Sequence, residues 1–192
     1  MQGTSVDTIL LAGNTTYHWR GRGRNTCGEG VSSTTRAFTT VANFCRTVNQ
    51  PLAANSVRED TITVPANAAG VLQNLDIRFV QNNIPASSIR VDLTRLADNR
   101  GVRLLEAGCN AGTSINTTFD DAAASPPCNR NPLASRITPT QALLSFDGGS
   151  LAGDWRIRVE NTGTTAGQFI LWCLQPQSLV PSGLFGNGFE TP

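Results

Sequence analysis

Apolar and polar residues alternate with a period of two in several short segments of the chain. Trp155, Ile157 and Val159 are separated by charged residues at positions 154, 156, 158 and 160. Successive side chains of a β-strand point to opposite faces, so this pattern predicts a strand with one buried and one exposed face. Residues 75–80 and 89–94 show the same alternation. These segments are typical of half-buried strands in an antiparallel sheet.

The remaining strand candidates are shorter or wholly apolar. Residues 169–174 are nearly all apolar, which predicts a strand buried on both faces. Residues 38–44, 61–64 and 102–105 are further candidates, and Gly-, Asn- or Pro-containing turns follow most of them. Short strands that recur every ~8–12 residues, without a helix of ordinary length, predict an all-β sandwich or jelly roll.

The apolar positions of these strands define the predicted core. Its members are Leu75, Ile77, Phe79, Ile89, Val91, Leu93, Trp155, Ile157, Val159, Trp172 and Leu174. The two tryptophans in this group fit core packing better than a platform for stacking sugars. Tyr17 and Trp19 lie in a polar segment and are the better candidates for an exposed binding surface.

Three regions are expected along the chain. Residues 1–35 lack periodicity and predict an irregular N-terminal extension, whose Arg20–Arg24 run fits a solvated loop better than a site for RNA or an anionic polymer. Residues 36–177 would form the sandwich, and residues 178–192, which are rich in proline and glycine, an extended tail. Residues 106–136 read as a long polar loop inside the sandwich.

The composition excludes several classes of protein. The 192 residues suit one domain with an appendage, and 15 basic against 14 acidic residues give no global preference for nucleic acid or an anionic membrane. All basic residues are arginine. No apolar run approaches the ~20 residues that span a bilayer. We therefore expect no nucleic-acid partner and no membrane span.

Five cysteines point to an oxidising compartment. Cys109 and Cys128 stand near the two ends of the 106–136 loop and are the best candidate pair, because a disulfide between them would tie the loop down. Cys27–Cys45 is favoured next by proximity in sequence and would leave Cys173 as a buried thiol. Pairing of Cys45 with Cys173 is the alternative.

Catalytic chemistry finds little support in the sequence. His18 is the only histidine, no Gly-x-Ser-x-Gly elbow is present, and no phosphate-binding loop occurs. A single His and the absence of Cys-x-x-Cys also argue against a zinc site. We expect a protein that is not itself an enzyme, with no catalytic residues.

Calcium is the one metal that the sequence brings into question. Asn116, Asp120, Asp121 and Asp147 carry oxygen ligands of the kind that calcium prefers. The alternative is that Asp120 and Asp121 cap a turn by accepting hydrogen bonds from backbone N–H groups. Calcium is the only cofactor that we consider.

Several motifs occur in a specific order between about residues 48 and 175. They are Asn49–Asn55, Leu75-Asp-Ile-Arg-Phe79, Ile89-Arg-Val-Asp-Leu93, Asn116-Thr-Thr-Phe-Asp-Asp121, Phe146-Asp-Gly148, Gly153-Asp-Trp155 and Gly167…Trp172-Cys-Leu174. In this order the chain resembles the P domain, or P/Homo B domain, which follows the catalytic domain of subtilisin-like proprotein convertases and bacterial secreted proteases. The chain departs from the family at Val80-Gln81, where a Thr-His pair is usual, and at Ser87-Ser88, where Gly-Asp is usual.

The resemblance implies a jelly-roll-like antiparallel β-sandwich of the galactose-binding-domain-like type. It also implies a non-catalytic secreted accessory module that stabilises or docks a protease domain or another protein, with a serine endopeptidase as the parent protein. The alternative is an extracellular module that binds carbohydrate or a cell surface, with a glycan as its partner. Residues 185–190 are similar to a short tail of secreted Gram-negative proteins, which favours export from such a bacterium to the medium or the cell surface.

Overall fold

A computed structural model of the chain describes residues 16–26, 28–39, 42–66, 70–108, 112–123 and 133–180. The chain divides into two compact units, Met1–Ala42 and Asn43–Pro192. The loss of periodicity before residue 36 predicts a boundary at residue 35, whereas the structure includes β4 (Arg36–Thr39) in the first unit.

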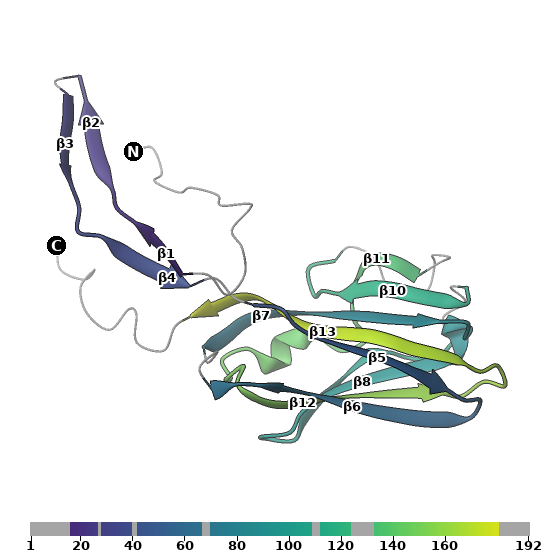
Figure 1. Ribbon diagram of the computed structural model, residues 1–192. Coiled ribbons are helices and arrows are strands. Elements are labelled where there is room, and N and C mark those ends of the chain that lie inside the picture. Colours follow the sequence, from purple (N-terminus) through teal and green to yellow (C-terminus); the bar gives the residue numbers. More distant parts are fainter. Residues whose placement is uncertain are drawn as a thin grey trace. The chain divides into compact units, whose positions relative to one another are not determined.

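The second unit is an all-β sandwich of two sheets (Figure 1). One sheet has five strands in the order β11 (Leu133–Ile137), β10 (Ser114–Phe119), β7 (Val71–Asn82), β13 (Gly167–Val180) and β5 (Phe44–Leu52). The other has four strands in the order β6 (Ser56–Val64), β12 (Gly153–Asn161), β8 (Ile89–Arg95) and β9 (Arg100–Leu105). All neighbouring strands are antiparallel except β10 and β11. The only helices among the described residues are two 3-10 turns, η2 (Ala86–Ser88) and η3 (Leu143–Phe146).

The alternation in β12 is confirmed. Trp155, Ile157 and Val159 are buried, while the residues between them are partly or fully exposed. In register with them, Leu93 pairs with Ile157 and Val91 with Val159 on the neighbouring strand β8. All residues that the sequence placed in the core belong to one buried apolar cluster. Burial of this apolar surface is the main source of the sandwich's stability.

Both core tryptophans also satisfy their polar N–H groups. The Nε1 of Trp155 donates to the carbonyl of Leu151 at 2.8 Å, and its ring packs edge-on against Phe146 at 4.9 Å between centroids. The Nε1 of Trp172 donates to the carboxylate of Asp60 at 2.7 Å, which joins β13 of one sheet to β6 of the other. A buried indole needs such a partner, so these bonds fix how each ring is oriented in the core.

The segment predicted as a long loop contains two strands. β10 and all of β11 except Ile137 lie within residues 106–136, and the two strands form one edge of the five-stranded sheet. Ile115, Thr117 and Phe119 of β10 are buried, so the strand does alternate, but a threonine occupies one of its inward positions. The first half of the Asn49–Asn55 motif belongs to β5, which continues to Leu52.

The first unit contains paired strands where the sequence suggested irregular structure. β1 (Thr16–Trp19) pairs with β4, and β2 (Arg22–Asn25) pairs with β3 (Gly28–Ser32), both antiparallel. Nearly every described side chain on these strands is exposed, so neither face selects apolar residues and no alternation appears in the sequence. Residues 1–15 and the part of the predicted tail beyond Val180 lie outside the described residues.

Candidate functional site

The only histidine of the chain belongs to the first unit. His18 is exposed on β1, opposite Ala37 of β4. No hydrogen bond or ion pair joins its imidazole ring to another described residue. A serine or cysteine nucleophile of the protease type needs a histidine base within hydrogen-bond reach.

Asp121 caps the 3-10 helix η3. Its two carboxylate oxygens accept hydrogen bonds from the backbone N–H groups of Leu143 at 2.9 Å and Leu144 at 2.7 Å. These N–H groups at the start of the helix would otherwise lack a partner. Asp121 thus fastens the end of β10 to a segment more than twenty residues away in sequence.

Asp120 holds the turn after β10 and shares an arginine with Asp76. One of its oxygens accepts a hydrogen bond from the N–H of Ala122 at 2.8 Å, and the other binds Arg136 at 2.7 Å. Arg136 also binds Oδ2 of Asp76 at 2.6 Å. Both carboxylates are buried, and Oδ1 of Asp76 has no partner among the described residues.

Burial disfavours the charged form of Asp76. Desolvation raises the pKa of its carboxyl from 3.8 to about 6, although the neighbouring Arg136 acts to lower it. The negative charges of Asp120 and Asp121 add to the rise in pKa. Asp76 was not singled out from the sequence, because its alternation with Leu75 and Ile77 suggested an exposed position.

The residues suggested as calcium ligands do not fit a calcium site. Asn116 is exposed on β10 and accepts a hydrogen bond from Arg78 at 3.0 Å, and the oxygens of Asp120 and Asp121 are occupied by N–H donors. Burial and the nearby charge of Asp121 raise the pKa of Asp147, which disfavours the anion that would bind a metal. Within the described part of the chain, no three acidic, His or Cys side chains gather in a way that could hold a metal ion.

The disulfide differs from the pairing favoured by the sequence. Cys45 is bonded to Cys173, which stands directly opposite it on the neighbouring strand. The Cys27–Cys45 pairing is therefore wrong, and the alternative holds, because strand pairing brings Cys45 and Cys173 together across 128 residues. Cys27, Cys109 and Cys128 lie outside the described residues.

The aromatic side chains fall into two groups. Trp155 and Trp172 are completely buried and offer no platform to a sugar. Trp19 is 50% exposed on β1, and Tyr17 lies two residues before it on the same strand. Aromatic surface is thus open to solvent on the N-terminal strands, as the sequence suggested.

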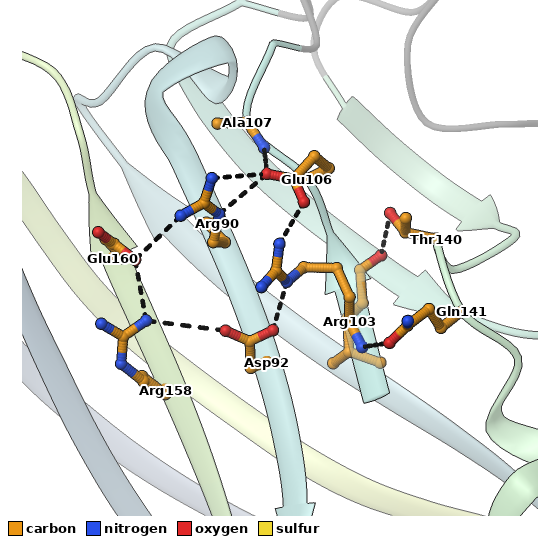
Figure 2. A network of polar contacts seen from close by, with 10 residues as sticks. Arg90, Asp92, Arg103, Glu106, Ala107, Thr140, Gln141, Arg158 and Glu160 are labelled. Carbon is orange, nitrogen blue, oxygen red and sulfur yellow. Dashed lines mark hydrogen bonds and ion pairs between the residues drawn. The ribbon is translucent and has the colours of Figure 1, made fainter. Parts of the chain in front are cut away.

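A chain of ion pairs covers the outer face of the four-stranded sheet (Figure 2). We call it the charge ladder. It consists of Arg90, Asp92, Arg103, Glu106, Arg158 and Glu160. Each of these arginines contacts two carboxylates, and each carboxylate contacts two arginines.

The ladder favours the charged state of Arg103, Glu106 and Glu160. The hydrogen bond from Arg158 lowers the pKa of Glu160, and the one from Arg90 lowers the pKa of Glu106. The hydrogen bond to Asp92 raises the pKa of Arg103. Partly exposed ion pairs stabilise a protein little one by one, but a connected set fixes long side chains in defined positions.

An open pocket of about 320 Å³ lies beside the ladder. We call it the arginine pocket. Its polar lining comes from Asp92, Thr94, Arg103, Gln141, Arg156 and Arg158, with Gly101 beside Thr94 on the adjacent strand. The alternation in the sequence predicts that the Arg and Asp residues of β8 and β12 point outward. It does not predict which of these residues stand side by side on β8, β9 and β12. The sequence therefore did not reveal the pocket.

A buried cation supports the core from one end of the same sheet. Arg95 lies over the ring of Trp155, with 5.9 Å from its guanidinium carbon to the ring centroid, and its N–H groups bind Asp98 and the carbonyl of Ser150. Its hydrogen bonds lower the pKa of Asp98 to about 2. The alternation pattern could not predict the role of Arg95, because an arginine at an inward strand position interrupts the run of apolar residues.

The chain matches no protein-family model and no curated protein sequence. Two solved structures are similar in shape, both of the serine protease of Aeromonas sobria. One is its complex with a chaperone, at 15% identity and a TM-score of 0.43, and the other is the protease alone, at 14% and 0.42. Each alignment covers 80% of this chain and 32% of the protease, so the chain spans about a third of that protein's length. Similarity at this level carries no conclusion about function. No described helix is long and apolar enough to cross a membrane.

Proposed function

We propose that this chain is a non-catalytic, secreted accessory module of the P-domain type, which stabilises or docks a protease domain or another protein. The proposal rests on the motifs shared with that family, and one observation supports it most: the motif residues form the framework of the sandwich. Asp121 caps η3, and Trp155 and Trp172 fill the core with their N–H groups satisfied.

The motif glycines serve the same framework. A Cβ at Gly167 would lie 2.2 Å from the carbonyl oxygen of Asn82, so only glycine allows β13 to begin so close to the end of β7. Gly153 has φ near +115°, a backbone conformation that other residues rarely adopt, at the start of β12.

The Cys45–Cys173 disulfide supports export to an oxidising compartment, since such bonds persist mainly outside the cytosol. In that setting a rigid sandwich can stabilise a neighbouring domain, because any surface that binds only the folded partner adds to the partner's stability.

Two measurements test the proposal. The first is labelling of the isolated chain with a fluorophosphonate probe, for which no labelling is expected and stoichiometric labelling would overturn the non-catalytic assignment. The second is sedimentation velocity of the chain mixed with a subtilisin-type catalytic domain, which the proposal expects to be encoded beside it. A 1:1 complex is expected, whereas independent sedimentation of the two proteins, or a gene neighbourhood without such a domain, would contradict the accessory role.

A further inference from the structure

The arginine pocket is created by a missing side chain on the outer face of the four-stranded sheet. Arg156 of β12 stands opposite Thr94 of β8, and Thr94 stands opposite Gly101 of β9. This set of paired positions across the three strands therefore ends in a glycine on β9. In the neighbouring set, the position on β9 is Arg103, which stands opposite Asp92. A Cβ at position 101 would approach Oγ1 of Thr94 to 3.2 Å, so even one added carbon would crowd the floor of the pocket.

Two of the guanidinium groups that line the pocket are held in place before any ligand arrives. Arg103 is bound to Asp92 and Glu106, and Arg158 is bound to Glu160 at 2.8 Å and to Asp92 at 3.7 Å (Figure 2). Because their rotamers are already fixed, a ligand that binds here would not have to order them.

The pocket has many unused donors and few acceptors. Arg103 and Arg158 use only part of their N–H groups in the ladder, and Arg156 makes a single long contact of 3.5 Å with Glu59. Oε1 of Gln141 accepts a hydrogen bond from the N–H of Arg103 at 2.6 Å, so the amide NH₂ of Gln141 remains available as a donor. Asp92 is the only carboxylate in the lining. A ligand rich in acceptors and carrying negative charge fits this lining.

The surrounding charges favour an anion of charge −1. Asp92 lines the pocket, and Glu59, Glu106 and Glu160 bind the same arginines from outside it. A doubly charged phosphate or sulfate would be repelled by these four carboxylates more strongly than a carboxylate would. The planar carboxylate also matches the forked N–H geometry of a guanidinium group.

We propose that the arginine pocket binds an aspartate or glutamate side chain from an acidic segment of the partner protein. The choice of a protein source rests on the proposed accessory function, whereas the carboxylate chemistry rests on the pocket itself. Arg156 is the main contact, because it is the arginine of the pocket least committed to other residues.

The test uses the whole chain and a tetraglutamate peptide with blocked ends, with tetraglutamine as the uncharged control. Backbone amide signals of Thr94 and Gly101 and the side-chain amide of Gln141 should shift in a saturable way with tetraglutamate and not with tetraglutamine. Arg156→Gln should weaken binding about tenfold, since a charge-assisted hydrogen bond is lost. Arg78→Gln is the matched control on the other sheet, where its partner is the neutral Asn116, and should leave binding unchanged.

Gly101→Val provides a second variant that fills the pocket while keeping every arginine, and it should abolish the shifts while the chain stays folded. The proposal is overturned if no signal moves at about 10 mM peptide, or if Arg156→Gln binds as well as the unaltered chain. Equal or stronger binding of inorganic phosphate, or of a sulfated polysaccharide, would also overturn it. This titration needs no protease, so the carboxylate-binding proposal can fail while a complex with a catalytic domain still forms. Equally, the pocket can bind tetraglutamate while no such complex forms.

Discussion

At the scale of single residues, the buried acidic side chains of this protein act on the protein's own structure. Arg136 joins Asp76 to Asp120, and Asp121 binds the first N–H groups of η3. Breaking such a buried contact leaves polar groups without partners, which is costly in a region with little water. The ionisation of Asp76 and the capping by Asp121 can each be tested separately.

Asp76 should make the protein less stable as the pH rises. Its pKa is about 6 in the folded chain against 3.8 for an ordinary aspartate, so the folded state holds the proton more tightly. The penalty for ionisation is absent below about pH 4, grows through the window up to about pH 6 and is complete above it. The melting temperature of Asp76→Asn relative to the unaltered chain should therefore rise between pH 4 and pH 7.

Asp98→Asn is the control for this titration, because the pKa of the Asp98 carboxyl is lowered, to about 2, in the folded chain. Its carboxylate contributes stability above the pKa of the unfolded chain and loses it as the pH falls, so the variant's deficit should shrink toward pH 2. A constant difference for Asp76→Asn across the same pH range would contradict the raised pKa.

Replacing Asp121 by alanine should lower the free energy of unfolding by about 1–2 kcal/mol, the usual loss for a helix cap. Urea denaturation should give the same loss in excess calcium and in excess chelator, because the oxygens of Asp121 bind N–H groups. Asp147→Ala should stay within about 0.5 kcal/mol in both conditions. A loss that both variants show only in calcium would restore the metal-site interpretation.

At the scale of elements, alternation predicted strands that are more buried on one face than on the other, and an apolar run predicted β13. β7, β8 and β12 have the alternating pattern, so their existence and their inward residues followed from the sequence. β10 carries an inward threonine, and the strands of the N-terminal unit have two exposed faces, so neither signals a strand by hydrophobicity.

Features that depend on strand register could not be predicted. The Cys45–Cys173 bond, the charge ladder and the arginine pocket all require knowledge of which residues stand side by side on different strands. Short-range proximity in sequence favoured Cys27 as the partner of Cys45, whereas long-range pairing of β5 with β13 decides it. Turn positions and glycines identify the connections between strands but leave this register open.

Replacing Cys45 and Cys173 together by alanine should lower the free energy of unfolding by about 2–5 kcal/mol, because the bond closes a loop of 128 residues in the unfolded chain. Denaturant unfolding under oxidising conditions measures the loss, and Cys27→Ala should leave the Cys45–Cys173 bond intact. Peptide mapping without reduction should recover Cys45 joined to Cys173, and recovery of Cys45 joined to Cys27 would contradict the structure.

At the scale of the whole molecule, the sandwich concentrates its polar chemistry on its outer surfaces and at its loops. The core between the sheets is apolar, and the outer face of the four-stranded sheet carries the charge ladder. This distribution suits a rigid module that binds through its surface. The proposed accessory function therefore predicts that the chain raises the stability of a partner.

The accessory function requires a subtilisin-type catalytic domain encoded beside this chain, and the most direct measurement is the rate at which heat inactivates that domain with and without the chain. We predict a half-life several-fold longer in the presence of the chain, because binding to the folded catalytic domain slows its loss. Arg78→Gln should protect as well as the unaltered chain. An unchanged half-life at saturating concentrations of the chain would contradict the accessory function.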